Sequence, residues 1–138
     1  MKSAWKLLLT AWLVAVIATA GALFIGEVML MVPCQLCWYQ RICMFPLVFI
    51  LGMACWSDDR RGAVYALPLA LGGAAIAGYH TLLVAGLIPK AWIPCSAGVS
   101  CADQKLEILN GIPIPWLSLA AFVAIAVLLT IFLRKTSR

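Results

Sequence analysis

The chain has 138 residues, of which 65% are hydrophobic and only 11% charged, and its mean hydropathy is +1.06. Ordinary soluble domains carry roughly 25% charged residues, so this composition excludes a soluble domain and indicates a membrane protein. The formal net charge is +5, but the basic residues cluster at the ends of apolar segments, where they set orientation in a membrane, and this argues against nucleic-acid binding. The length predicts one integral-membrane domain, residues 1–138.

The first apolar segment, residues 7–26, follows a basic start and is long enough to cross a hydrocarbon core of roughly 30 Å as a helix. The sequence Ala18-Thr19-Ala20 also fits the cleavage site of a secretory signal peptide. We favour an uncleaved span, because the apolar run continues beyond this site instead of becoming polar. In either case Cys34 is expected outside the cell.

Three further spans are predicted, at 34–56, 63–88 and 116–133. The third contains several small residues, which let neighbouring helices approach closely in lipid, and it carries His80. The sequence therefore predicts an all-α membrane protein, a bundle of four transmembrane helices.

Two polar segments join the last three predicted spans. A short turn at 57–62 follows the second span, and a long loop at 89–115 follows the third. Within this loop the stretch 103–109, DQKLEIL, is predicted to form one or two turns of surface helix with its apolar side chains toward the membrane.

The distribution of basic residues predicts how the bundle is oriented. Lys and Arg number two at the N-terminus, two in the 57–62 turn and three at the C-terminus, against two in the 89–115 loop. Positively charged segments stay inside, so both termini and the short turn are expected in the cytoplasm. The segment around Cys34 and the 89–115 loop then become two cysteine-bearing extracytoplasmic segments.

The six cysteines divide by depth. Cys43 and Cys55 fall inside the second span and are expected to serve as small apolar side chains. The other four lie at or beyond the outer surface, where disulfides persist in bacteria: Cys34, Cys37, Cys95 and Cys101. On a helix, Cys34 and Cys37 share one face with Arg41, whereas Cys43 lies on the opposite face.

Three uses of the outer cysteines are open. A zinc site is disfavoured, because the spacing is unusual for structural zinc and no histidine accompanies the cysteines in the loops. Structural disulfides are possible, but a C-x-x-C bridge closes a very small ring and constrains the unfolded chain little. Redox exchange suits the C-x-x-C spacing best, since a helix N-terminus and a nearby cation stabilise a thiolate. We favour redox exchange and expect no metal.

Two ionisable residues are expected at similar depth in the outer half of the membrane. Arg41 lies about 10 Å below Cys34, and His80 about 12 Å below the end of the third span. Arg41 could extend its side chain to the interface, or it could favour the Cys37 thiolate and meet a polar ligand. His80 could meet the same ligand or hydrogen-bond to a neighbouring side chain.

Two motifs resemble those of a known family. Residues 33–41, PCQLCWYQR, stand at the outer start of the second span, and residues 94–101, PCSAGVSC, provide the second cysteine pair. Together with four spans, they resemble the DsbB/BdbC family of disulfide bond formation proteins over essentially the whole chain. The short spacing of the second pair resembles the BdbC type. Gln40 stands where many members have glutamate.

The resemblance implies a thiol:quinone oxidoreductase of the bacterial cytoplasmic membrane. Cys34 and Cys37 match the pair coupled to a membrane quinone, ubiquinone or menaquinone, and Cys95 and Cys101 match the pair that meets a protein partner. The residues that match the quinone site are Cys37, Arg41 and His80. The implied partner is a soluble extracytoplasmic thioredoxin-fold thiol oxidase of the DsbA/BdbD kind, which the enzyme would reoxidise to support disulfide formation in exported proteins.

Two other functions are open. Electrons could run the other way, in a thiol reductant exporter or an enzyme resembling vitamin K epoxide reductase. The chain could also be a non-enzymatic membrane protein whose outer cysteines form structural disulfides. The quinone type, the partner's identity, the oligomeric state and the loop cysteine attacked first are open as well.

Overall fold

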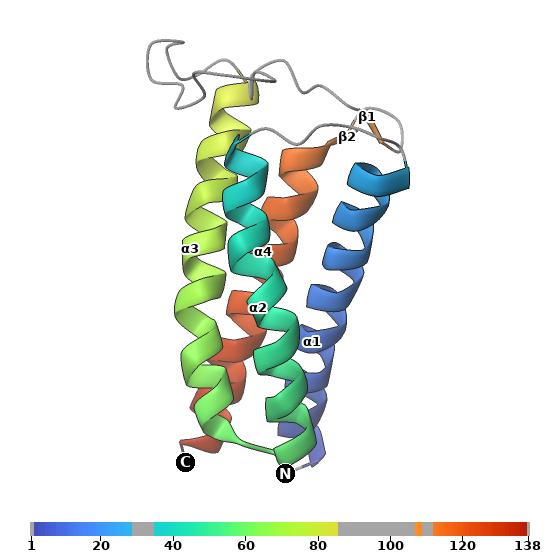
Figure 1. Ribbon diagram of the computed structural model, residues 1–138. Helices are drawn as coiled ribbons and strands as arrows, with labels where there is room; N and C mark the ends of the chain where they lie inside the picture. Colours follow the sequence, from blue (N-terminus) through green and yellow to red (C-terminus); the bar gives the residue numbers. More distant parts are fainter. Residues whose placement is uncertain (1, 29–34, 86–106, 109–111, 138) are drawn as a thin grey trace.

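The computed structural model describes residues 2–28, 35–85, 107–108 and 112–137. These residues form four long helices, a short π-helical segment and a pair of two-residue strands (Figure 1). In chain order the elements are α1 (Lys2–Leu23), η1 (Phe24–Val28), α2 (Gln35–Ser57), α3 (Arg60–Val84), β1 (Glu107–Ile108), β2 (Ile112–Pro113) and α4 (Ile114–Thr136).

The four helices close into a bundle. Helix α1 packs against α2 and α4, and α3 packs against the same two helices. All four are long and apolar enough to cross a membrane, so the predicted all-α, four-span fold is confirmed. Both ends of the chain lie at the same end of the bundle (Figure 1). That this end faces the cytoplasm stays a prediction.

The helices extend to or past most of the predicted span limits. Helix α1 begins at Lys2, five residues before the expected start, because Lys2, Ala4 and Lys6 are good helix formers. Only Asp58 and Asp59 separate α2 from α3. Asp58 has a φ of 50°, and the Asp59 N–H donates to the Ala54 carbonyl at 3.1 Å, as in a Schellman motif.

Asp59 also begins the next helix. Its side chain accepts a hydrogen bond of 2.9 Å from the Arg61 N–H, which satisfies one of the donors that a helix N-terminus leaves open. One aspartate thus ends the first helix of this hairpin and caps the second. The polar turn predicted at 57–62 is therefore shorter than expected, because Arg60, Arg61 and Gly62 are already helical.

The prediction of a surface helix at 103–109 is wrong for the two residues of that stretch that the structure describes. Glu107 and Ile108 form β1, which pairs antiparallel with β2 in the register Glu107↔Pro113 and Ile108↔Ile112. The intervening sequence contains Asn110-Gly111, a dipeptide that favours a tight hairpin turn. The pairing of β1 with β2 therefore replaces the helical pattern expected for Glu107 and Ile108.

Small residues line the helix contacts. The buried positions include eight alanines from the first three helices: Ala4, Ala11, Ala15, Ala54, Ala63, Ala66, Ala70 and Ala77. On α3, a Cβ added at Gly73 would overlap the ring of Phe122 on α4. Hydrophobicity gives little drive for helix association in lipid, so close van der Waals packing of this kind must stabilise the bundle.

Two tryptophans join α1 to α2. The Trp5 indole N–H donates to the Cys55 carbonyl at 3.1 Å, and the Trp12 indole N–H donates to the Val48 carbonyl at 3.0 Å. An indole donor in an apolar environment needs a partner, and here a backbone carbonyl of the neighbouring helix supplies it. These bonds fix the register of α1 against α2.

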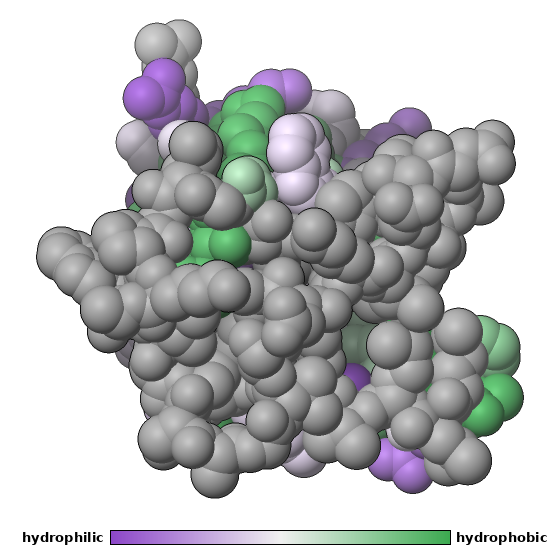
Figure 2. Space-filling view, turned by 90° about the horizontal axis from the view of Figure 1, so that it is seen from above, coloured by the Kyte–Doolittle hydropathy of each residue, from purple (hydrophilic) through white to green (hydrophobic). Residues whose placement is uncertain are grey.

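The outer surface of the bundle is apolar. Trp38 and Trp116 are 52% and 54% exposed near one end, and Trp56 is 95% exposed near the other, an arrangement typical of aromatic belts at membrane interfaces. Viewed from the end opposite the termini (Figure 2), the described residues at the rim include strongly hydrophobic ones beside hydrophilic ones. This mixture fits the boundary between lipid and water.

Candidate active site

Cys37 lies in the first turn of α2, at the bundle end opposite the chain termini. Its Sγ is 4.0 Å from Nδ1 of His80, which lies one turn before the end of α3. A helix N-terminus favours a thiolate, and the imidazole adds a group that can accept the thiol proton. The structure therefore brings together Cys37 and His80, two predicted site residues from different helices.

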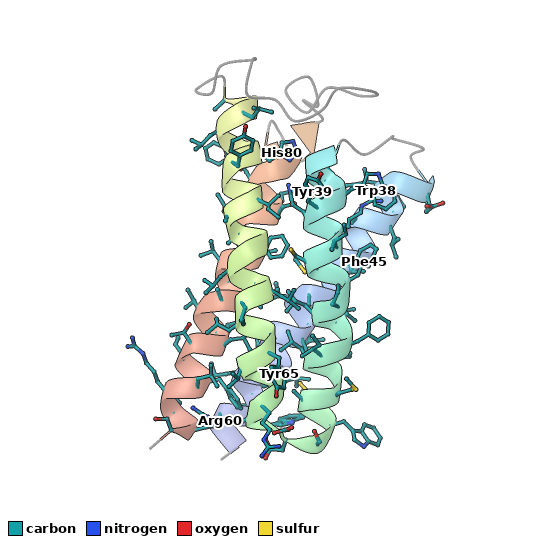
Figure 3. The ribbon with its side chains drawn as sticks, turned by 60° about the vertical axis from the view of Figure 1, so that its left-hand side comes forward. Trp38, Tyr39, Phe45, Arg60, Tyr65 and His80 are labelled. Carbon is teal, nitrogen blue, oxygen red and sulfur yellow. The ribbon has the colours of Figure 1, made fainter. Side chains whose placement is uncertain are left out.

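His80 is nearly inaccessible, with an exposed fraction of 1%. Figure 3 shows it at the same end of the bundle as Trp38 and Tyr39, far from Arg60 and Tyr65 at the other end. A buried histidine in a span needs a polar partner, because hydrocarbon offers none. Among the described residues, Gln40 lies beside His80 as well as Cys37.

Gln40 is a site residue that the sequence reasoning missed. Its side chain is buried, with an exposed fraction of 6%, and its Nε2 lies 3.0 Å from His80 Nδ1. The signal was available in the sequence, because Gln40 follows Cys37 by three residues and so lies on nearly the same side of α2. A polar amide within a span is expected to face the bundle interior.

Arg41 points to the other neighbour of α2. Its Nη2 donates to the Ala22 carbonyl of α1 at 2.9 Å, and its Cζ lies 5.4 Å from the centroid of the Trp38 ring, within the range of a cation–π contact. A Cβ at Gly26, in η1, would come 2.9 Å from the same Nη2. Arg41 thus fits against a glycine of η1, the segment that continues α1.

The predicted site is therefore divided about α2. Cys37 and Gln40 meet His80 on the α3 side, and Arg41 meets Ala22 on the α1 side. The described contacts of Arg41 do not include Cys37. The predictions for Cys34, Cys95 and Cys101 lie outside the described residues.

The other two cysteines that the structure describes lie beside the hydrophobic core. Cys43 and Cys55 are partly buried, carry free thiols and pack against the hydrophobic core, as expected for small apolar side chains. Within the described part of the chain, no group of three or more His, Cys, Asp or Glu side chains could hold a metal ion.

The fold is that of a multi-pass membrane protein with four spans. Its candidate site, a cysteine beside a buried histidine, suits thiol chemistry. The comparisons with known proteins define it further. Residues 3–132 match the family model described as disulfide bond formation protein DsbB. The chain belongs to this family, as its cysteine motifs predicted.

Relatives from several bacteria agree. A probable disulfide formation protein of Metapseudomonas resinovorans is 53% identical over 96% of this chain and 93% of its own length. Disulfide bond formation protein C of Bacillus subtilis is 43% identical over 92% of each chain, and a probable disulfide formation protein of Chlamydia muridarum is 45% identical over 91% of this chain and 90% of its own. No solved structure matches the chain significantly. The family gives this membrane protein an oxidoreductase role in disulfide formation.

Proposed function

We propose that the chain is a thiol:quinone oxidoreductase that reoxidises a soluble thioredoxin-fold thiol oxidase and passes the electrons to a membrane quinone. One observation carries the proposal: in a chain of the DsbB family, the second cysteine of a C-x-x-C pair lies against a buried histidine at the end of a membrane bundle. Such a thiol can be deprotonated and can exchange with a disulfide.

The residues near Cys37 suit a quinone. A quinone presents carbonyl oxygens on a flat apolar ring, so it needs hydrogen-bond donors beside an apolar surface that is open to lipid. Arg41 provides several N–H donors, of which one is used by Ala22 within the described structure. Trp38 and Ile42 on the same helix are 52% and 62% exposed. Cys37 and His80 on the α3 side of α2 and Arg41 on its α1 side would hold the quinone, as the family resemblance implies.

The electron path runs through two cysteine pairs. A thiolate of the reduced partner attacks the Cys95–Cys101 disulfide at Cys95 and releases Cys101, and the partner's second thiol then resolves the mixed disulfide. The loop dithiol next reduces the Cys34–Cys37 disulfide. His80 accepts a proton from Cys37, and the Arg41 guanidinium stabilises negative charge on a bound carbonyl oxygen. When bound, the quinone supplies the oxidant, because it takes up the electrons and protons released as Cys34 and Cys37 form their disulfide again.

This function requires the cysteine end of the bundle to face outward. The opposite end carries both termini, the Asp58-Asp59 turn and seven of the ten Lys and Arg residues. An excess of positive charge marks the cytoplasmic side, which supports a location in the bacterial cytoplasmic membrane with the active cysteines on the extracytoplasmic face.

The redox state of the outer thiols in membranes tests the proposal. Membranes are prepared from cells with and without quinone, and free thiols are trapped with an alkylating reagent that changes the mobility of the chain. A thiol:quinone oxidoreductase accumulates reduced cysteines when quinone is absent and recovers its disulfides when quinone is added back. Cysteines whose redox state ignores quinone would instead indicate structural disulfides or an outward-directed reductant.

A further inference from the structure

Nδ1 of His80 faces two side chains of α2 at once. Gln40 Nε2 lies 3.0 Å from it and Cys37 Sγ lies 4.0 Å from it. All three residues are at least partly shielded, and the two nitrogen-bearing side chains are buried, with exposed fractions of 6% and 1%. The distance to sulfur is long, as hydrogen bonds of reacting groups often are in structures without substrate. A single ring nitrogen thus connects the cysteine with the amide.

The amide of Gln40 can serve this nitrogen in either protonation state. When Nδ1 carries a lone pair, the amide N–H donates to it. When Nδ1 carries a proton, the amide can turn about its last torsion so that its oxygen accepts instead, a rotation between two similar shapes. An ionised carboxylate at this position could only accept, and an aliphatic side chain could do neither.

We propose that Gln40 is a positioning residue that holds His80 Nδ1 beside Cys37 and turns its amide as a proton passes between them. In the forward step the S–H bond of Cys37 breaks and an N–H bond forms at Nδ1. The electron pair stays on sulfur, which becomes a thiolate, and His80 becomes an imidazolium. Gln40 then presents Oε1 to the new N–H. The inference rests on the proposed function only in requiring that Cys37 cycle between disulfide and thiol.

The neutral amide of Gln40 allows a proton to move between Cys37 and His80 in both directions. A carboxylate would hold the proton on His80 in every redox state, because a buried ion pair is strongly destabilised by removing one charge. An aliphatic side chain in place of Gln40 would remove the hydrogen bond at Nδ1 that helps to set the ring orientation and the tautomer of His80. Gln40 keeps the ring oriented while leaving both protonation states accessible.

The chain contains one histidine, so nitrogen NMR can report on His80 alone. The full chain is labelled with ¹⁵N-histidine, placed in lipid nanodiscs and measured as the oxidised protein and after reduction. In the oxidised protein we expect the proton on Nε2, with Nδ1 accepting from Gln40, favoured by about tenfold for one hydrogen bond of ordinary strength. In the reduced protein we expect a second proton to appear on Nδ1.

Two substitutions at Gln40 separate positioning from simple packing. Gln40→Leu should lower the preference of the oxidised protein for the tautomer with the proton on Nε2 by about tenfold, the contribution of the lost hydrogen bond. Gln40→Glu should keep a proton on Nδ1 in both redox states. The matched control is Thr81→Val: Thr81 is a buried polar residue next to His80 on α3, but its hydroxyl donates to the Ala77 carbonyl of α3 and not to His80. This control should leave the His80 signals of both redox states unchanged.

The proposal is overturned if His80 gives the same signals in the wild type and in both Gln40 variants, or if the wild-type signals do not depend on redox state. Its failure is distinguishable from failure of the proposed function. A wild-type protein that never reduces quinone would contradict the proposed function whatever His80 does. A protein that reduces quinone with His80 signals indifferent to Gln40 would contradict only the positioning role.

Discussion

Three cysteines of α2 meet different surroundings. Cys37 faces the imidazole of His80, whereas Cys43 and Cys55 pack against apolar side chains of the core. The reactive form of a cysteine is the thiolate. A helix N-terminus and a neighbouring group that takes up the thiol proton favour the thiolate, whereas an apolar environment disfavours it. The same helix therefore carries one candidate reactive thiol and two thiols that are expected to be inert.

We accordingly predict a division among serine variants. Cys37→Ser should abolish catalytic oxidation of a thiol partner, as should serine at Cys34, Cys95 or Cys101, because each removes a sulfur that has to form a disulfide. Serine at Cys43 or Cys55 should leave most of the turnover. The measurement is partner oxidation in membranes containing equal amounts of each variant. Near-normal turnover by any of the first four variants would refute a relay through two cysteine pairs.

Arg41 leads to a prediction about quinone affinity. If Arg41 binds quinone as proposed, Arg41→Ala removes charge-assisted hydrogen bonds to a quinone carbonyl oxygen and should raise the apparent KM for quinone by roughly tenfold to a hundredfold. The KM for the soluble partner should change little. Arg41→Lys should restore affinity only in part, because a point charge does not reproduce the planar guanidinium. Steady-state kinetics with each substrate varied in turn makes the comparison.

Two glycines of the first span allow the placement of Arg41 to be tested without replacing Arg41 itself. A Cβ at Gly26 would crowd the guanidinium of Arg41 at 2.9 Å, whereas a Cβ at Gly21 would meet nothing within 4 Å. Gly26→Ala should therefore raise the quinone KM in the same direction as Arg41→Ala, and Gly21→Ala should not. If both alanine variants behave like the wild type, the observed placement of Arg41 does not matter for quinone affinity.

At the scale of the element, α3 and α4 meet through a glycine. Gly73 lies against the Phe122 ring and has no room for a Cβ, whereas its neighbour Gly72 has open space around it. Gly73→Ala should reduce the free energy of unfolding by about 1–3 kcal/mol, because α3 and α4 must separate or Phe122 must leave its rotamer. Gly72→Ala should leave it unchanged or raise it by up to about 1 kcal/mol.

Reversible unfolding in mixed detergent micelles measures both effects. The two substitutions add the same methyl group to adjacent positions of one helix, so any difference between them reports packing and not helix propensity. Equal stabilities of the two variants would show that α3 and α4 do not pack through Gly73.

The helices themselves could be predicted from the sequence, because each span is a long apolar run bounded by charged or turn-forming residues. The rotation of each helix about its axis could not. Cys37, Gln40 and Arg41 lie within about one helical turn, and only the packing of α1 and α3 on either side decides that Gln40 meets His80 and that Arg41 meets Ala22. Grouping Arg41 with Cys37 on one face missed this division.

Local hydrogen bonds account for the other differences between the sequence prediction and the structure. Asp59 caps α3 and starts it three residues before the predicted span, a side-chain hydrogen bond that hydropathy does not register. The strand at Glu107–Ile108 depends on its pairing with Ile112–Pro113, and a two-residue strand has too little periodicity to be recognised by itself.

At the scale of the whole molecule, the candidate reactive residues lie at one end of the bundle and most of the basic residues lie at the other. Cys37, His80 and Arg41 lie near the end opposite the termini, and the described aromatic residues Trp38 and Trp116 flank that end. In the proposed function, a lipid-soluble quinone would reach this level from within the membrane, and a water-soluble thiol partner would reach it from the extracytoplasmic side. A site at the rim of a membrane-embedded bundle would let both substrates reach it.

The central claim is that electrons from a thiol partner reach quinone through this chain. The most direct measurement mixes the purified protein in nanodiscs with a reduced thioredoxin-fold partner and a known amount of quinone, and follows quinol and partner disulfide together. The account predicts one quinol for each disulfide formed, with no quinol when Cys37→Ser replaces the wild type. Partner oxidation without quinol formation, or net reduction of the partner's disulfide, would contradict it.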